Sequence, residues 1–504
     1  MHFLPIAHCK LAQAMTLTNE ELRNKFAPFI SRRDEDRHIN IFWETSPSKY
    51  SDPSKQFIEL SGGMPHTSFF PIESMNVNIL TAPGSTETIN VPITREQPKK
   101  LALAHTLQYA LSEGFQPLID FVRAFVTRLN NVPLYDPSLW QVLIANGSCD
   151  SLFKIFQTCT DERSVVLVEE LTFVPVISNI LATGAKVVPL KLSMSDDDQG
   201  IDTAYMDNLL ANWESGPYAN YDRPKFLYTI PTGQNPTGLT QSVEKRRKIY
   251  ALAQKYDFVI LEDDPYGYLK FPKFNHDQPE ENPYTSTEMT TERYARDVLM
   301  KSYISMDTDG RVIRFETFSK IFAPGMRLSF VILNNFFYEK LLKFQEITTR
   351  QPTGISQQIV YSTIHAMTPS NNTDDVIEAW LHWIMKLASC YTGRRNAMLD
   401  ALYKSEAYSK GLYSVVEPSA GMFIIVNVNF DEERGGVVQQ MNELSKVMDT
   451  HGVRAILGYK MAVDRDFSSD HLNFFRLTYA YADNHEQLRE AISRLSDSVV
   501  EYLA

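Results

Sequence analysis

Residues 311–327 read Arg311-Val-Ile-Arg-Phe-Glu-Thr317-Phe-Ser319-Lys320-Ile-Phe-Ala-Pro-Gly-Met-Arg327. An apolar, strand-like run ends at Lys320, which has two hydroxyl groups just before it and an arginine seven positions after it. A single lysine is nearly always a solvated surface charge. At the end of a buried strand, beside groups that hold a phosphate, it is instead suited to covalent binding of a phosphorylated cofactor. The stretch therefore predicts pyridoxal phosphate, bound at Lys320.

The middle of the chain alternates continuous apolar runs with helical patterns, such as the amphipathic pattern over 243–256. This alternation predicts an α/β fold with a mostly parallel sheet and helices on both faces. Ligands bind beyond the carboxyl ends of the strands in such sheets. The expected strands are Ser164–Val168, Lys186–Leu190, Lys225–Ile230, Phe258–Leu261, Arg311–Thr317 and Leu328–Leu333.

A chain of 504 residues is too long for one simple core, and we expect two main domains. We expect residues 1–20 to be a flexible leader and 21–75 to be an N-terminal arm that packs on the small domain. Residues 76–365 are expected to form the large cofactor-binding domain, and 366–504 a smaller α+β domain. In that smaller domain we expect a helix over 379–391 and strands over Met422–Val428 and Phe474–Thr478.

Composition limits the classes of partner. Lys+Arg 49 against Asp+Glu 61 gives a net charge of −12, which disfavours nucleic acid and anionic membranes. No apolar run approaches the roughly 20 residues that a membrane helix needs. The four cysteines lack the spacing of a zinc or redox motif, so we expect no metal site and a cytoplasmic protein. Residues 1–14 fit either an unstructured leader or a transit peptide, and the lack of arginine favours the leader.

Two further motifs follow predicted strands. Pro231-Thr-Gly-Gln-Asn235-Pro-Thr-Gly238 forms a defined loop with Asn235 at its apex, although Asn-Pro-x-Gly alone indicates only a turn. Leu261-Glu-Asp263-Asp-Pro-Tyr266 places a carboxylate where it can meet a ring nitrogen, and Tyr266 can reach the same ring. An Asp-Asp pair alone is more simply a helix cap or a solvated surface. The three motifs occur in order, each after a strand, and together they indicate one site.

On these motifs the chain resembles the fold-type I pyridoxal-phosphate aminotransferases of subgroup I, over roughly residues 55 to 490. It is most similar to the type II enzymes among the fungal aromatic amino acid aminotransferases. The resemblance implies a homodimer that transfers an amino group between aromatic amino acids (Phe, Tyr or Trp) and a 2-oxo acid. It also implies ping-pong kinetics through pyridoxamine phosphate.

The resemblance further implies a role for each matching residue. Lys320 binds the cofactor covalently and then moves a proton. Asp263 pairs with the pyridine nitrogen, while Asn235 and Tyr266 hydrogen-bond the phenolic oxygen of the ring. Lys320, Asp263 and Tyr266 form the catalytic set.

The remaining implied roles concern the phosphate, the ring face and the substrate. The phosphate contacts are Thr317, Ser319, Arg327, the start of a helix at Ser148 and Cys149, and Tyr109 crossing from the neighbouring subunit. Phe173 stacks on the ring. Arg476 holds the substrate carboxylate, and Gly62, Gly63 and Asn235 border the substrate. Phe69, Phe70, Tyr459 and Met461 either line the side-chain pocket or are ordinary packing residues.

Some positions depart from the pattern and some alternatives stay open. Cys149 replaces a glutamine common in relatives, and Phe173 replaces a tyrosine. A site-closing arginine near the N-terminus has three candidates, Arg32, Arg33 and Arg37. A 2-aminoadipate or kynurenine aminotransferase is the nearer alternative, and carbon–sulfur lyases and aminocyclopropane-carboxylate synthases share the ring-binding motifs. An aminotransferase-like transcription regulator would need a basic DNA-binding domain ahead of Ser61, where no helix-turn-helix pattern is present.

Overall fold

The computed structural model describes residues 17–38, 62–96, 101–130, 139–371 and 373–504, with isolated positions at 54, 55, 58, 60 and 132. A seven-stranded sheet forms the centre of a large domain, in the order β3-β11-β10-β9-β8-β4-β5. All its neighbouring strands pair in parallel except those that pair with β11. The strands are β3 (Trp140–Ala145), β4 (Val165–Glu169), β5 (Lys186–Leu190), β8 (Phe226–Thr229), β9 (Val259–Asp263), β10 (Val312–Thr317) and β11 (Ser329–Asn334).

Six of these strands were predicted from their apolar runs, with ends that differ from the observed ones by at most two residues. The central strands β4, β8, β9 and β10 are buried along their whole length, as continuous apolar runs predict. β3 was not predicted, although Trp-Gln-Val-Leu-Ile-Ala carries a comparable apolar run.

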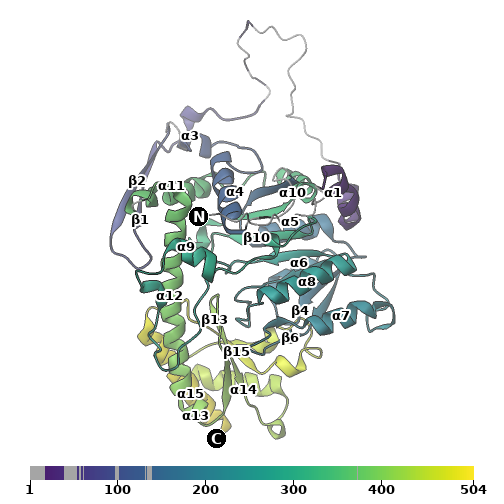
Figure 1. Cartoon of the computed structure of the whole chain (residues 1–504), viewed down its shortest axis with the longest axis vertical. Coiled ribbons are helices and arrows are strands. Elements are labelled where there is room, and N and C mark those ends of the chain that lie inside the picture. Colours follow the sequence, from purple (N-terminus) through teal and green to yellow (C-terminus); the bar gives the residue numbers. More distant parts are fainter. Residues whose placement is uncertain are drawn as a thin grey trace, which may run out of the picture.

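Helices cover the sheet of the large domain (Figure 1). α5 contacts α6 and α10, while α7 packs on α8, whose predicted range 243–256 is confirmed. Their bounds are α4 (Gln116–Asn130), α5 (Ser148–Cys159), α6 (Val174–Leu181), α7 (Thr203–Ala211), α8 (Val243–Tyr256), α9 (Thr291–Arg293), α10 (Asn335–Ile347) and α11 (Gly354–Ser370).

A second, antiparallel sheet forms the centre of a small domain, in the order β12-β13-β15-β14. Its strands are β12 (Tyr413–Val416), β13 (Phe423–Val428), β14 (Ile456–Leu457) and β15 (Phe474–Thr478). The helices beside it are α13 (Glu406–Ser409), α14 (Val437–Thr450) and α15 (His485–Leu503). The predicted strands over Met422–Val428 and Phe474–Thr478 are confirmed to within one residue.

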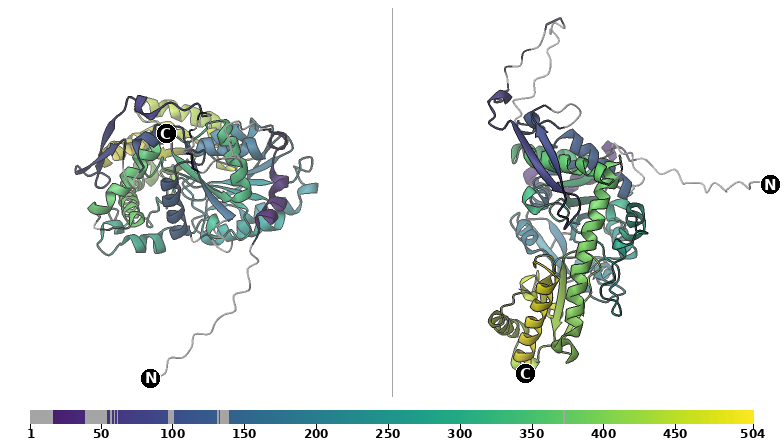
Figure 2. Two further views of the ribbon diagram at one scale, coloured as in Figure 1. Left: turned by 90° about the horizontal axis from the view of Figure 1, so that it is seen from above. Right: turned by 90° about the vertical axis from the view of Figure 1, so that its left-hand side faces the viewer.

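One long helix, α12 (Val376–Lys404), joins the two domains (Figures 1 and 2). Its first half packs on the large domain, where the ring of Trp380 lies 6.4 Å from that of Phe318. In the same half, Trp383 Nε1 donates to the carbonyl of Ile321 at 3.0 Å. Its second half packs beside α15. The predicted domain boundary at residue 366 therefore precedes a helix that both domains share.

The prediction that residues 21–75 pack on the small domain is wrong for residues 21–38. α1 (Asn19–Phe26) and α2 (Arg32–Glu35) lie on the large domain, beside α10 and α5. Apolar contacts fix them there: the ring of Phe26 lies 5.2 Å from that of Phe337, and Phe29 lies 5.8 Å from Phe226. The polar surface pattern of this segment gave no indication of which domain these phenylalanines would meet.

Two smaller sheets complete the described fold. β1 (Ser74–Leu80) and β2 (Thr88–Thr94) form an antiparallel hairpin that contacts α11 and α3 (Leu103–Thr106), whereas β6 (Leu192–Ser193) pairs with β7 (Gly200–Ile201). None of these strands was predicted. Within the described residues, no helix combines the length and apolarity needed to cross a membrane.

Candidate active site

The predicted site residues gather where the parallel strands end. β3, β4, β8, β9 and β10 run in the same direction, so their carboxyl ends meet at one edge of the sheet. Ser148 and Cys149 follow β3, Phe173 follows β4, and Asn235 follows β8. Asp263 is the last residue of β9, and Thr317, Ser319 and Lys320 stand at the end of β10. The fold thus places at one edge residues that lie far apart in sequence.

Asp263 has two carboxylate oxygens in different surroundings. The side chain is 5% exposed, and its Oδ2 accepts a hydrogen bond of 2.7 Å from the hydroxyl of Tyr228. Its Oδ1 is buried and has no partner among the described residues. Burial raises the pKa of the Asp263 carboxyl to about 7, and Tyr228 opposes that rise. Buried polar atoms are rarely left unpaired, so Oδ1 marks the place of a donor such as a protonated ring nitrogen.

Lys320 is half-buried, directly after the buried end of β10. Burial lowers the pKa of its amine, and the positive charges of Arg327 and Arg476 lower it further. A lowered pKa increases the neutral fraction of the amine, and only the neutral amine is a nucleophile or a base. The position therefore suits covalent binding of a carbonyl compound.

Hydroxyl, amide and guanidinium groups meet beside Lys320. Thr317 Oγ1 lies 2.8 Å from Ser319 Oγ, and it accepts a hydrogen bond of 3.1 Å from the Ser319 backbone N–H. Arg327 adopts a left-handed backbone with φ of 46°. A Cβ built on Gly147, the residue before α5, would stand only 2.3 Å from Arg327 Nη2. A helix N-terminus beside an arginine is an anion-binding arrangement, which fits a phosphate.

Cys149 lies in the first turn of α5, where its electrostatic neighbours are Asp263, Arg327 and Lys320. Burial raises the pKa of its thiol, and the carboxylate of Asp263 raises it further. The thiol therefore stays protonated near neutral pH and is a poor nucleophile. Its contribution to anion binding is restricted to the backbone N–H of the helix terminus.

A buried network holds the loop that carries Asn235. The amide of Gln234 donates to Glu169 Oε2 at 2.9 Å and to the carbonyl of Leu171 at 2.6 Å. The Oε1 of Gln234 accepts from the backbone and side chain of Thr237. Thr229 Oγ1 donates to Glu169 at 2.6 Å, so one carboxylate connects the ends of β4 and β8 to the loop. This network holds the loop on both sides of Asn235.

The small domain contributes Arg476, from β15. Its Nη1 donates to Asn235 Oδ1 at 2.7 Å, and its guanidinium carbon lies 4.4 Å from the ring centre of Phe423. Its Nε is buried and has no partner among the described residues. The ring of Tyr266 meets the same Phe423 edge-on at 6.0 Å. An arginine with an unpaired buried donor is suited to a substrate carboxylate.

Two predicted residues are not brought to this cluster within the single chain. Tyr109 is 59% exposed and lines a surface groove of about 350 Å³ with Phe70 and Gln351. Gly63 stands in open space, because a Cβ built on it would meet nothing within 4 Å. Phe173 is half-buried at the cap of α6, at the edge of the sheet where the site lies.

The structure also shows where the candidate pocket-lining residues and the three candidate site-closing arginines lie. Phe69 is 82% exposed, whereas Tyr459 is buried with its hydroxyl donating to Asn442 at 2.8 Å. Arg33 donates to the carbonyls of Thr160 and Thr183. Arg37 pairs with Asp34, and Arg32 pairs with Glu162 at 3.8 Å. All three arginines thus have partners in the N-terminal segment or the large domain.

Sequence reasoning missed four contributors to the site: Tyr228, Glu169, Gln234 and Phe423. Tyr228 lay inside the predicted strand Lys225–Ile230 and Glu169 directly after the predicted strand Ser164–Val168, so a polar group at or near a buried strand end was a usable signal. Gln234 stood within a quoted motif. Phe423 had no signal, because its role depends on the packing of β13 against Arg476.

The residues of this edge fit pyridoxal phosphate. The unpaired Oδ1 of Asp263 suits the pyridinium N–H, Arg327 and the start of α5 suit the phosphate, and Lys320 suits the aldehyde. Among the described residues, no group of three His, Cys, Asp or Glu side chains is placed to hold a metal ion.

Comparison with known proteins agrees with this geometry. The model of the family "Aminotransferase class I and II" matches residues 75–495. Aromatic amino acid aminotransferase 2 of Saccharomyces cerevisiae is 48% identical over 501 residues, covering 95% of this chain and 96% of the yeast protein. An L-tyrosine:2-oxoglutarate aminotransferase of Serpula lacrymans is 32% identical, covering 82% of this chain and 76% of that protein. The crystal structure of an aromatic aminotransferase from Candida albicans superposes with a TM-score of 0.86 at 40% identity, covering 95% and 98% of the two chains.

The chain belongs to the class I and II aminotransferases. Its cofactor is pyridoxal phosphate, which this family uses. The predicted fold class, a mostly parallel sheet with a smaller α+β domain, is confirmed.

Proposed function

We propose that the chain transfers the amino group of aromatic amino acids to a 2-oxo acid, with Lys320, Asp263 and Tyr266 as its catalytic residues. The observation that carries this proposal is a contact between two groups of site residues, one from each domain. Asp263, with its unpaired Oδ1, belongs to the large domain, whereas Arg476, with its unpaired Nε, belongs to the small one. The hydrogen bond from Arg476 to Asn235 joins them. A ring-binding group and a carboxylate-binding group at this junction suit an α-amino acid.

Arg476 orients the substrate. Its guanidinium group takes the α-carboxylate in two parallel hydrogen bonds, and Asn235 and Phe423 hold the guanidinium plane. A fixed carboxylate determines which bond of the α-carbon faces the reacting groups. Pyridoxal phosphate, when bound, supplies an electron sink for the charge that develops at that carbon.

Lys320 moves the proton. Its neutral amine accepts the α-proton of the substrate and returns it, as a general base and then a general acid. Burial and the nearby cations Arg327 and Arg476 keep the pKa of this amine below its usual range, which supports the role. With pyridoxal phosphate bound, Tyr266 and Asn235 would donate to the ring oxygen, and Asp263 would hold the ring nitrogen.

The aromatic substrate class is supported by the names of the similar proteins. The yeast and Candida proteins are named as aromatic aminotransferases, and the Serpula protein is named for L-tyrosine and 2-oxoglutarate. We therefore propose phenylalanine, tyrosine and tryptophan as amino donors, with 2-oxoglutarate and phenylpyruvate as acceptors. The chain works in the cytoplasm, a proposal supported by its scattered cysteines, of which Cys149, Cys159 and Cys390 are free thiols.

A panel of amino donors tests the substrate class. With 2-oxoglutarate as acceptor, kcat/KM is measured for phenylalanine, tyrosine, tryptophan, 2-aminoadipate, kynurenine and alanine. An apolar pocket discriminates by roughly 10–200-fold, so the aromatic donors should exceed alanine by about tenfold or more. Lys320→Ala supplies the background. Higher kcat/KM values for 2-aminoadipate or kynurenine than for every aromatic donor would contradict the proposal.

We also propose a homodimer in which Tyr109 reaches the phosphate of the neighbouring subunit. Tyr109 is 59% exposed, and Leu111 nearby is 69% exposed. Exposed apolar side chains beside a groove are typical of interaction surfaces. In this arrangement each site needs residues from two chains.

A further inference from the structure

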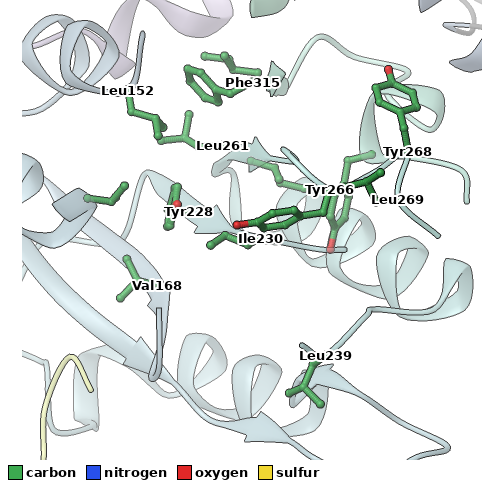
Figure 3. Packing of buried hydrophobic residues seen from close by; sticks show 14 of the residues in the cluster. Leu152, Val168, Tyr228, Ile230, Leu239, Leu261, Tyr266, Tyr268, Leu269 and Phe315 are labelled. Carbon is green, nitrogen blue, oxygen red and sulfur yellow. The ribbon is translucent and has the colours of Figure 1, made fainter. Parts of the chain in front are cut away.

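Tyr228 contributes a hydroxyl group that none of the sequence motifs includes. It lies on β8, fully buried, and its register partners are Val168 on β4 and Leu261 on β9 (Figure 3). Its hydroxyl donates to Asp263 Oδ2 at 2.7 Å. The opposite oxygen of the same carboxylate, Oδ1, is buried and has no partner among the described residues. Tyr228 thus occupies one side of the carboxylate and leaves the other side free.

The hydroxyl of Tyr228 is a permanent donor. Burial raises the pKa of Tyr228 well above its usual range, and the charge of Asp263 raises it further. The hydroxyl therefore keeps its proton at and around neutral pH. A hydroxyl that keeps its proton gives Asp263 Oδ2 a constant hydrogen bond. Such a hydroxyl does not compete with Asp263 for the proton on the ring nitrogen.

We propose that Tyr228 is the positioning residue of Asp263: its hydroxyl holds Oδ2, keeps the carboxylate ionised in a buried place, and aims Oδ1 at the pyridine nitrogen of the cofactor. The inference rests on the role of Asp263 proposed above. Without Tyr228, Asp263 would have two unpaired buried oxygens, and a buried carboxylate with too few donors takes up a proton. A protonated carboxyl group no longer provides the negative charge that the pyridinium nitrogen needs.

The other groups around Asp263 largely oppose its ionisation. Burial and the charge of Asp264 raise the pKa of Asp263, whereas Tyr228 and Arg314 lower it, and the net result is a pKa of about 7. The charge of Asp263 in turn raises the pKa of Glu169, Tyr266 and Cys149. The titratable or charged groups that face Asp263 are therefore Tyr228, Asp264, Arg314, Glu169, Tyr266 and Cys149. Among them Tyr228 alone makes a direct hydrogen bond to the carboxylate.

The consequence is a pH dependence of cofactor binding. In the protein without cofactor, the carboxyl group of Asp263 gains its proton as the pH falls through about 7, and that proton competes with the ring nitrogen. Affinity for pyridoxal phosphate should therefore decrease on the acid side. Removal of the Tyr228 hydroxyl raises the pKa of Asp263 and moves this decrease to higher pH. Loss of a charge-assisted hydrogen bond should shift the midpoint upward by about one pH unit, a factor of about ten in affinity.

The test is the dissociation constant of pyridoxal phosphate, measured by quenching of protein fluorescence from about pH 5.5 to about pH 8.5. Wild-type protein and Tyr228→Phe are compared, both stripped of cofactor beforehand. Phenylalanine fills the same volume, so only the hydroxyl is lost. The ionisations of free pyridoxal phosphate are the same in both experiments, so they cancel when the wild-type protein and Tyr228→Phe are compared. We expect an acid midpoint about one pH unit higher in Tyr228→Phe, with the affinities converging at alkaline pH.

Tyr250→Phe is the matched control. Tyr250 lies on α8, away from the site, and its hydroxyl donates to Asp309 Oδ1 at 2.7 Å, with Asp307 Oδ1 at 3.1 Å from the same hydroxyl oxygen. Tyr250→Phe loses the same kind of tyrosine–carboxylate hydrogen bond. The acid midpoint of its cofactor affinity should equal that of the wild type. A Tyr228→Phe midpoint equal to that of the wild type, or affinity reduced by one factor at all pH values, would overturn the inference. Failure of the wild-type protein to bind the cofactor would instead contradict the site assignment itself.

Discussion

Lys270 and Lys320 both have depressed amine pKa values, and sequence motifs distinguish the two better than burial does. Burial, together with the charges of Arg246 and Arg395, lowers the pKa of Lys270 to about 7. Burial also lowers the pKa of Lys320. Lys270 Nζ, however, donates to Ser419 Oγ at 2.6 Å, which engages it in the contact between the domains. Lys320 has the hydroxyl and guanidinium groups beside it.

We expect Lys320→Ala to lose the covalent link to pyridoxal phosphate and all detectable transamination. Lys270→Ala should keep both, because its amine bonds to a serine and not to the cofactor. Borohydride reduction followed by peptide mass spectrometry locates the modified lysine in the wild-type protein and in each variant. A modified peptide that contains Lys270 would show that the depressed pKa, and not the motif, identifies the reactive lysine.

At the scale of elements, the loop between β8 and α8 packs against the turn between β12 and β13. A Cβ built on Gly421 would lie 2.8 Å from the carbonyl oxygen of Gly233, and one built on Gly233 would lie 2.6 Å from Gly421 Cα. The turn is fixed to the large domain by two hydrogen bonds, from Phe271 N to the carbonyl of Ser419 and from Gly421 N to that of Leu269. Two glycines therefore allow the small domain to approach the loop that carries Asn235.

We expect Gly421→Ala to separate this loop from Arg476 and to raise KM for both the amino acid and the oxo acid. The added Cβ meets backbone atoms, and overpacking of this kind costs about 1–3 kcal/mol. A left-handed φ of 86° adds about 1 kcal/mol for a residue with a side chain. Thermal unfolding and steady-state kinetics measure the two effects.

Gly411→Ala is the control for the backbone effect alone. Gly411 has a φ of 70°, and a Cβ built on it would meet nothing within 4 Å. It should lose stability to the same backbone strain with KM unchanged. Equal KM values for Gly421→Ala and Gly411→Ala would show that the glycine contact does not position the site.

At the scale of the whole molecule, the proposed dimer would complete each site with Tyr109 from the neighbouring chain. Tyr109 is exposed, and in the single chain it lies in a groove with Phe70 and Gln351. A C2 dimer would place the same surface of two chains face to face, so each chain could give its tyrosine to the other. Under this proposal an isolated chain binds phosphate with an incomplete set of donors.

Mixed dimers of Lys320→Ala and Tyr109→Ala test this arrangement. If Tyr109 serves the neighbouring subunit, one site of each mixed dimer has both Lys320 and Tyr109. Random reassociation of equal amounts should then restore about a quarter of the wild-type sites, because half of the dimers are mixed. Co-expression with two affinity tags allows the mixed dimers to be purified and assayed. Activity no greater than the average of the two parent proteins would show that Tyr109 acts within its own chain.

The sequence by itself determined six of the seven strands of the large sheet and the residues that follow them. Buried parallel strands are continuous apolar runs, and polar motifs after such runs fall at the carboxyl edge of the sheet. Lys320, Asp263 and Asn235 could therefore be assigned to one site from local pattern alone. The family also followed, because the motifs are contiguous in sequence and keep their order.

Only the tertiary structure decided which groups touch across the fold. Arg476 and Asn235 are 241 residues apart, and Tyr228 and Asp263 are 35 apart, yet each pair is joined by a hydrogen bond of 2.7 Å. The tertiary structure also decided that α1 packs on α10, whereas the sequence had predicted that this N-terminal segment packs on the small domain. Hydrophobic periodicity indicates which face of a helix or strand is buried, but not which other segment covers that face. The partner of a buried group is set by the packing of the whole chain, where a phenylalanine or a tyrosine meets whichever surface is complementary.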